Sequence, residues 1–141
     1  MRTPRALRAA LLAVAGVNAV SALAGMVGLI LGDGMGLPRS TLDATPFDSW
    51  VWPAIILGVV VGGAQLLAAV AQVLQLSLAW GLHAASGLVL VIWTFVEVAM
   101  LLVWSPLQGV FFALGVVQVV LAVLALGAWP RPALRREQSP E

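Results

Sequence analysis

The chain has 141 residues, of which 62% are hydrophobic and 9% charged, and its formal net charge is only +1. A soluble domain is roughly 45–50% apolar and about 25% charged, so this composition excludes a water-soluble domain and predicts a single membrane domain over residues 1–141. With no Cys, one His and no basic patch suited to nucleic acid, the sequence also predicts no disulfide, no metal or other cofactor, no nucleic-acid partner and no enzymatic activity.

The first predicted span covers residues 7–31, and its start is marked by Arg2, Arg5 and Arg8. A basic start and an apolar stretch also fit a cleaved signal peptide, but the apolar run continues well beyond the cleavage motif at 22–24. We therefore expect an uncleaved helix. Small residues at four-residue spacing let helix backbones approach closely in lipid. One face of this span combines small and polar residues: Asn18, Ser21, Gly25, Gly28 and Gly32.

A polar external loop is predicted over residues 32–50. Within it, Thr45–Asp48 has a hydroxyl N-cap residue, a proline at the first position and an acid that suits the helix dipole, so this segment predicts a helix start. Trp50 and Trp52 follow and are typical of a membrane–water interface. The loop is net acidic, and its charged residues are Asp33, Arg39, Asp43 and Asp48.

The second span is predicted over residues 53–75, with a kink or a restart of the helix at Pro53. Gly58 and Gly62 form a small-xxx-small pair, which predicts a close helix contact within the bundle or between copies of the chain. The stripe that contains this pair continues with Gln65, Ala69 and Gln72.

The last two spans are predicted over residues 79–104 and 106–129, and a cytoplasmic tail follows over 130–141. The segment Ser105–Gln108 combines an N-cap residue, a first-turn proline and a capping-box partner, which predicts a sharp helix start. Gln118 falls near the middle of the fourth span.

The third span contains an ionisable residue, Glu97, inside an apolar run from Trp80 to Trp104. A carboxyl group inside a bilayer is expensive unless it faces the protein interior or becomes neutral. At about 100° per residue, the polar and small residues of this span fall on one side of the helix, and the opposite side is apolar. This polar seam consists of His83, Ser86, Gly87, Leu90, Thr94 and Glu97.

The distribution of Arg predicts the orientation in the membrane. Three Arg lie at or before the start of the first span and three follow the fourth, while the loop has one. Basic flanks stay on the cytoplasmic side. An even number of spans also places both termini on the same side. We therefore predict an all-α transmembrane four-helix bundle with an N-in/C-in orientation.

Polar side chains are expected to meet around Glu97 in the bundle interior. Asn18, Gln65 and Gln118 fall near the middle of their spans, and Thr94 is close to the middle of the third. Because hydrocarbon disfavours a charged carboxyl group, we expect Glu97 to be protonated and to donate a hydrogen bond to one of these amides.

Three interpretations of Glu97 are open. It is a structural acid that fixes helix register, a proton-binding or cation-binding group of a small transporter, or the polar anchor of a pocket flanked by Trp93 and Trp104. Such a pocket would take a lipid-like or aromatic ligand, or another membrane protein. His83 is expected to extend toward the lipid headgroups. Four Trp are expected at the membrane interface: Trp50, Trp52, Trp104 and Trp129.

Several short patterns cover most of the chain: Thr45-Pro46-Phe47, Pro53 with Leu57, Gly62 with Gln65, Trp93 with Glu97, and Leu107-Gln108 with Phe111-Phe112 and Gly115. In these patterns the chain resembles a broad set of small bacterial four-span membrane proteins that are common in actinobacteria. The resemblance implies a multi-pass protein of the bacterial plasma membrane and brings no known activity with it. The size and span count are also those of small multidrug transporters, but those carry their essential acid in the first span, where this chain has Asn18.

The expected function is that of a structural, accessory or small-ligand-binding membrane protein whose polar interior is centred on Glu97. The alternative is a small proton- or cation-coupled transporter that acts as an oligomer. The expected partners are the lipid bilayer and either a second copy of the chain or another membrane protein.

Overall fold

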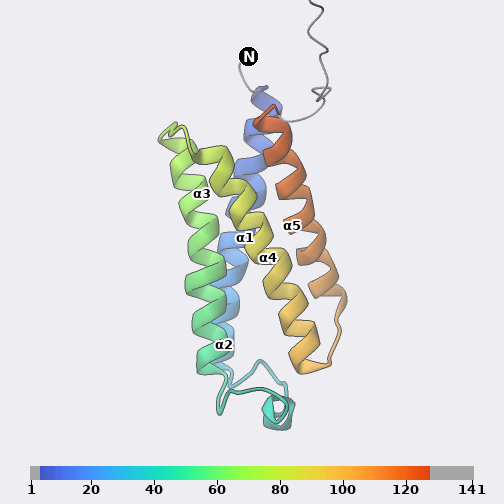
Figure 1. Ribbon diagram of the computed structural model, residues 1–141. Helices are drawn as coiled ribbons and strands as arrows, with labels where there is room; N and C mark the ends of the chain where they lie inside the picture. The colour runs from blue at the N-terminus through green and yellow to red at the C-terminus, as the bar shows by residue number, and fades with distance from the viewer. Residues whose placement is uncertain (1–3, 128–141) are drawn as a thin grey trace, which may run out of the picture.

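The computed structural model describes residues 4–127, and the regular secondary structure in this range is helical throughout (Figure 1). Four helical segments of 20 to 27 residues are long and apolar enough to cross a membrane. These four segments confirm the predicted all-α fold with four membrane spans. The segments are α1 (Arg5–Leu31), the continuous run from α2 to α3 (Val51–Val73), α4 (Ala79–Leu101) and α5 (Pro106–Ala125).

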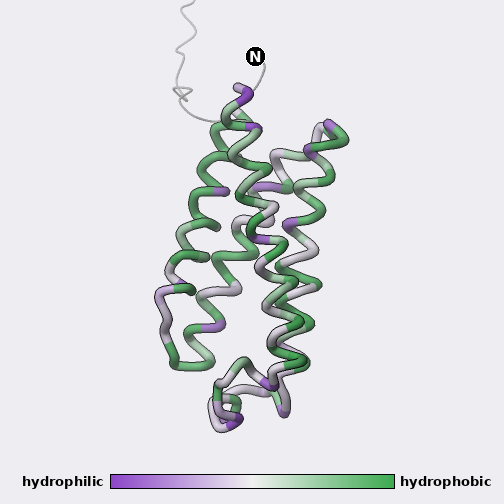
Figure 2. Tube along the Cα trace, turned by 180° about the vertical axis from the view of Figure 1, so that it is seen from behind, coloured by the Kyte–Doolittle hydropathy of each residue, from purple (hydrophilic) through white to green (hydrophobic). Residues whose placement is uncertain are grey.

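The helices form an up-and-down bundle. Its two ends are named here by what they carry: the loop end has residues 32–50, and the terminal end has the start of α1, the turn between α3 and α4, and the end of α5 (Figure 1). Hydrophobic residues cover most of the four spans, while hydrophilic ones gather in the loop and at isolated positions along the helices (Figure 2).

Two helices end three or four residues before their predicted bounds. Helix α4 stops at Leu101 because Leu102 takes a left-handed conformation with φ 52°, so Trp104 lies in the connection to α5 rather than in a span. Helix α5 ends at Ala125, although the span was predicted to continue to residue 129. The predicted tail over 130–141 lies outside the described residues. At the start of α5 the predicted capping box is present, and in it the Gln108 side-chain oxygen accepts a hydrogen bond from the Ser105 N–H at 2.9 Å.

The second span is one continuous helix with a wider middle section. Helix α2 (Val51–Ile55) leads into a π-helical segment, η2 (Ile56–Gly62), and then into α3 (Gly63–Val73). Pro53 lies in the first turn, where backbone N–H groups have no intrahelical acceptor, so its missing N–H costs no hydrogen bond.

The predicted contact glycines of this span lie on the face that packs against α1. A Cβ added at Gly58 would come within 2.9 Å of the Met26 Cβ, and one added at Gly62 would lie 3.3 Å from the Ala22 Cβ. On the α1 side, a Cβ at Gly25 would meet the Leu57 side chain at 2.8 Å. The α1–η2 contact is therefore close because both helices present small residues there.

A second glycine contact, between α4 and α5, was not predicted. A Cβ at Gly87 would lie 2.9 Å from the Gly115 carbonyl oxygen, and a Cβ at Gly115 would lie 3.0 Å from the Gly87 carbonyl oxygen. The two backbones thus touch reciprocally, and only glycine at both positions permits this distance.

The predicted helix start at Thr45–Asp48 is wrong. The Thr45 hydroxyl donates to the Leu42 carbonyl at 2.8 Å, which closes the end of the short 3-10 helix η1 (Arg39–Leu42), and accepts from the Phe47 N–H at 3.2 Å. This local turn satisfies the hydroxyl without a helix, and α2 begins only at Val51. Trp50, which was expected at the membrane interface, is only 3% exposed, and its indole packs against the turn at Gly34.

Replacing Gly62 with Leu is expected to lower the free energy of unfolding by about 1–3 kcal/mol, because the new side chain must displace Ala22 and Leu23. The matched control is Gly63→Leu on the same helix, where nothing lies within 4 Å of an added Cβ. Both variants gain the same helix propensity, so only the first should melt at a lower temperature in detergent. Equal melting temperatures for the two variants would contradict the observed contact.

Candidate functional site

The largest polar cluster in the described residues is a hydrogen-bonded network at the centre of the bundle, and Gln118 of α5 connects it. The Gln118 Nε2 donates to the Gln65 Oε1 and to the Ser86 Oγ, each at 2.9 Å. The Asn18 Nδ2 donates to the Gln118 Oε1 at 3.3 Å, and the Gln65 Nε2 donates to the Ser86 carbonyl at 3.2 Å. These four side chains come from α1, α3, α4 and α5, so one amide joins all four spans.

The network continues toward the terminal end through His83, which is fully buried rather than extended toward the headgroups. The Gln72 Nε2 donates to the Arg8 carbonyl at 2.6 Å, so the Gln72 Oε1 is the atom that faces the His83 Nε2 at 2.7 Å. The imidazole therefore carries its proton on Nε2, and its Nδ1 is an acceptor 3.3 Å from the Gln118 Nε2. His83 also stacks on Trp80, whose ring lies 6.0 Å from the Arg8 guanidinium.

Glu97 does not belong to this network, which corrects the expectation of a polar interior centred on it. Gln65 and Gln118 bond to each other and to Ser86, which precedes Glu97 by 11 residues, or about 16 Å along a helix. Thr94 bonds to the carbonyl of its own helix at Leu90, at 2.9 Å. The predicted hydrogen bonds from Glu97 to these amides are therefore not formed.

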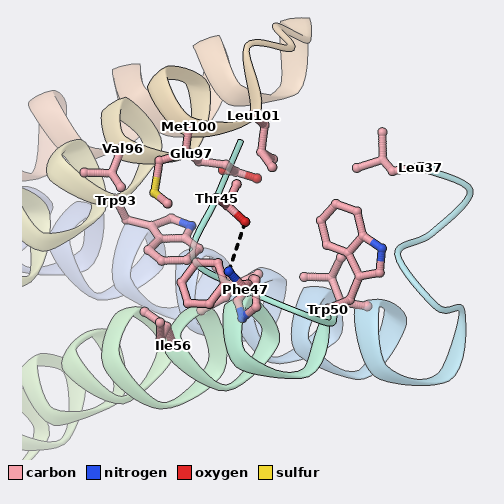
Figure 3. Close-up of a pocket in the computed structure, with 13 residues that line it drawn as sticks. Leu37, Thr45, Phe47, Trp50, Ile56, Trp93, Val96, Glu97, Met100 and Leu101 are labelled. Atoms are coloured by element: carbon pink, nitrogen blue, oxygen red, sulfur yellow. Dashed lines mark hydrogen bonds between the residues drawn. The ribbon is translucent and has the colours of Figure 1, made fainter. Parts of the chain in front are cut away.

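Glu97 instead lines a cavity of about 160 Å³ at the loop end. Glu97 and Trp93, one turn apart, project from α4 toward the loop residues Thr45 and Phe47, and Trp50 lies at the start of α2 (Figure 3). The remaining wall is apolar: Leu29, Leu37, Pro53, Ile56, Leu57, Val96, Met100 and Leu101.

The polar groups at this cavity are few. Among the residues that line it, Glu97 is the only ionisable one. The indole nitrogens of Trp93 and Trp50 are buried and have no hydrogen-bond partner in the described part of the chain. Beside the carboxyl group lies the amide of Gln108, whose oxygen is occupied by the Ser105 N–H, so its NH2 group can face the acid.

One interpretation expected Trp104 to flank the pocket of Glu97, but Trp104 does not line this cavity. It is 66% exposed and lines a separate, shallower groove between α4 and α5, together with Thr94, Phe95, Val98, Gln108, Gly109 and Phe112. The second aromatic wall of the Glu97 cavity comes from Phe47 and Trp50. Their part was not predicted, because a helical pattern places residues along an axis but does not show that a loop folds back over the bundle.

The other residues singled out from the sequence lie where helices meet. Asn18 is 2% exposed, with its Nδ2 in the network and its Oδ1 without a partner in the described residues. Ser21 is half-buried on α1, one turn before the contact glycine Gly25. Within residues 4–127 no group of three or more His, Cys, Asp or Glu could hold a metal ion.

Comparisons of the chain with protein-family models, with curated proteins and with solved structures found no match. The resemblance to small four-span proteins therefore stays a prediction, and the candidate site rests on its geometry alone.

The observed network makes Gln118, and not Glu97, the residue on which the stability of the bundle depends. Gln118→Leu should lower the free energy of unfolding by about 1–3 kcal/mol, because it leaves the buried amides of Asn18 and Gln65 with fewer partners. Glu97→Leu, at the edge of a cavity, should change it by less than about 0.5 kcal/mol. Unfolding by SDS in mixed micelles measures both variants. A larger loss of unfolding free energy for Glu97→Leu than for Gln118→Leu would mean that the acid has a structural role.

Proposed function

We propose that this protein is a non-catalytic, ligand-binding membrane protein that takes a small, largely apolar ligand into the Glu97 cavity. One observation carries the proposal: the single acid of the described spans lines a cavity instead of bonding to the polar interior. The interior network finds its partners without Glu97, so a structural role in that network is not needed to explain the acid.

The dimensions of the cavity support a ligand of modest size. An apolar cavity of about 150 Å³ holds a benzene molecule, and this cavity is close to that size. A ring or a branched alkyl group would fill it, and a longer tail would leave through its open side. The lining follows the usual composition of small-molecule sites, in which mostly apolar and aromatic side chains surround a few polar groups that fix orientation.

We further propose that the protein spans the bacterial plasma membrane with both termini in the cytoplasm. The Arg near the first span, the acidic loop and the even number of spans support this orientation. The loop end is then external, and the ligand reaches the cavity from outside the cell or from the outer leaflet.

A small proton- or cation-coupled transporter is the second candidate. It is favoured by the hydrogen-bonded chain that runs from Gln118 through His83 and Gln72 to the Arg8 carbonyl at the terminal end. Glu97 is not joined to that chain, so transport would require a rearrangement that brings the acid and the network together. An oligomer, or a complex with another membrane protein, would then supply the missing part of the pathway.

The topology is tested by reporter fusions. A reporter fused after Pro130 should be active only as a cytoplasmic reporter, and one inserted at Arg39 only as an external reporter. The physical reason is the retention of Arg-rich flanks in the cytoplasm. An external C-terminus would overturn the proposed orientation and with it the external position of the cavity.

The ligand site is tested by the reaction of Glu97 with dicyclohexylcarbodiimide, a lipid-soluble reagent whose cyclohexyl ring has about the size of benzene. The reagent should modify Glu97 in the detergent-solubilised protein, as measured by the mass of the α4 peptide, and should not modify that peptide in Glu97→Gln. Met100→Trp fills the cavity next to the acid and should slow the modification several-fold.

The two contrary outcomes have distinct meanings. No modification of the folded protein would mean that no small molecule reaches Glu97. Modification of Met100→Trp at the wild-type rate would mean that the reagent arrives directly from the lipid and not through the cavity. Either result contradicts the proposed ligand site.

A further inference from the structure

We infer that the ligand of the Glu97 cavity is an organic monocation of the alkylammonium class, an inference that rests on the proposed binding function. The charge of the lining is the first argument. The carboxyl group of Glu97 is the only ionisable group on the cavity wall, and no Arg, Lys or His lines it. A ligand with a positive charge is the one that would pair with this group, and an anion would find no basic partner in the wall.

The charges of the surrounding loop also favour a positively charged ligand. It contains three Asp and one Arg, and the single Arg39 is bonded to Asp33 at 3.0 Å. Asp43 and Asp48 have no ion-pair partner in the described residues and are exposed to solvent. The loop beside the cavity therefore has a negative potential, which raises the local concentration of cations.

The aromatic rings distinguish an organic cation from a metal ion. Three aromatic residues line the cavity, and the faces of indole and phenyl rings attract alkylammonium groups within about 6 Å (Figure 3). A hard metal cation requires about six oxygen ligands, and this wall offers one carboxyl group and the Thr45 hydroxyl. The three aromatic residues are Phe47, Trp50 and Trp93.

The volume of the cavity further defines the class of ligand. A trimethylammonium group is similar in size to benzene, which a cavity of this volume holds. The best-fitting head is therefore a quaternary or tertiary amine.

Choline and 3,3-dimethylbutan-1-ol provide a matched pair of probes, because they have nearly the same shape and only choline is charged. Calorimetric titration of the purified full chain in a non-ionic detergent should give an affinity for choline that is about tenfold higher than for the alcohol. In Glu97→Gln, the affinity for choline should fall about tenfold and that for the alcohol should stay the same. The exposed Asp43→Asn is the control and should change the affinity for choline by less than about threefold.

A second readout uses the carbodiimide reaction. Choline should protect Glu97 from modification, and the alcohol at the same concentration should protect it much less. Tighter binding of the alcohol than of choline, or the same affinity of wild type and Glu97→Gln for choline, overturns the cationic ligand while leaving a ligand cavity in place. Failure of both probes to bind, together with an unmodified Glu97, overturns the proposed function as well.

Discussion

The structure depends on one constraint: hydrocarbon offers no hydrogen-bond partner, so each polar group between the spans must be paired inside the protein. The chain meets this constraint largely with amides, which donate and accept at once. Gln118 bonds to side chains from the three other spans, and Gln65 adds a bond to the α4 backbone at Ser86. Because each partner sits at one height on its helix, this cluster fixes both the rotation and the axial position of the helices.

The same constraint explains why Glu97 is separate. An amide pairs with another amide without any change of protonation, whereas a carboxyl group must be neutral or meet a cation to be buried at low cost. The amides of Gln65 and Gln118 fill each other's hydrogen-bonding capacity. The acid is then free to face the cavity at the loop end. The cohesion of the interior thus depends on the amides, and the proposed ligand binding depends on the acid.

Helical periodicity predicted the features that depend on the sequence of a single helix. It gave the four spans, the small-residue face of the second span with Gly58 and Gly62, and the polar side of the third. It could not predict which polar sides meet, because that depends on the axial offset between helices, and the offset pairs Gln118 with Ser86 and not with Glu97. It also could not place Trp50, whose burial depends on the path of the loop. Gly87 and Gly115 were missed as a pair because each has its partner on another helix.

The position of the cavity follows from where the close contacts lie. Toward the terminal end, α4 is held to α3 by Gln65 and Ser86 and to α5 by Gly87. Toward the loop end, the bulky Trp93 packs against the cluster of Ala22, Val61 and Leu90, and α4 diverges from α2, as both views of the chain show (Figures 1 and 2). Two helices that touch at one end and are separated by an indole at the other cannot close completely. The loop covers the remaining space with Phe47 and Trp50 but does not fill it, so a cavity beside Glu97 is the geometric result of tight packing elsewhere.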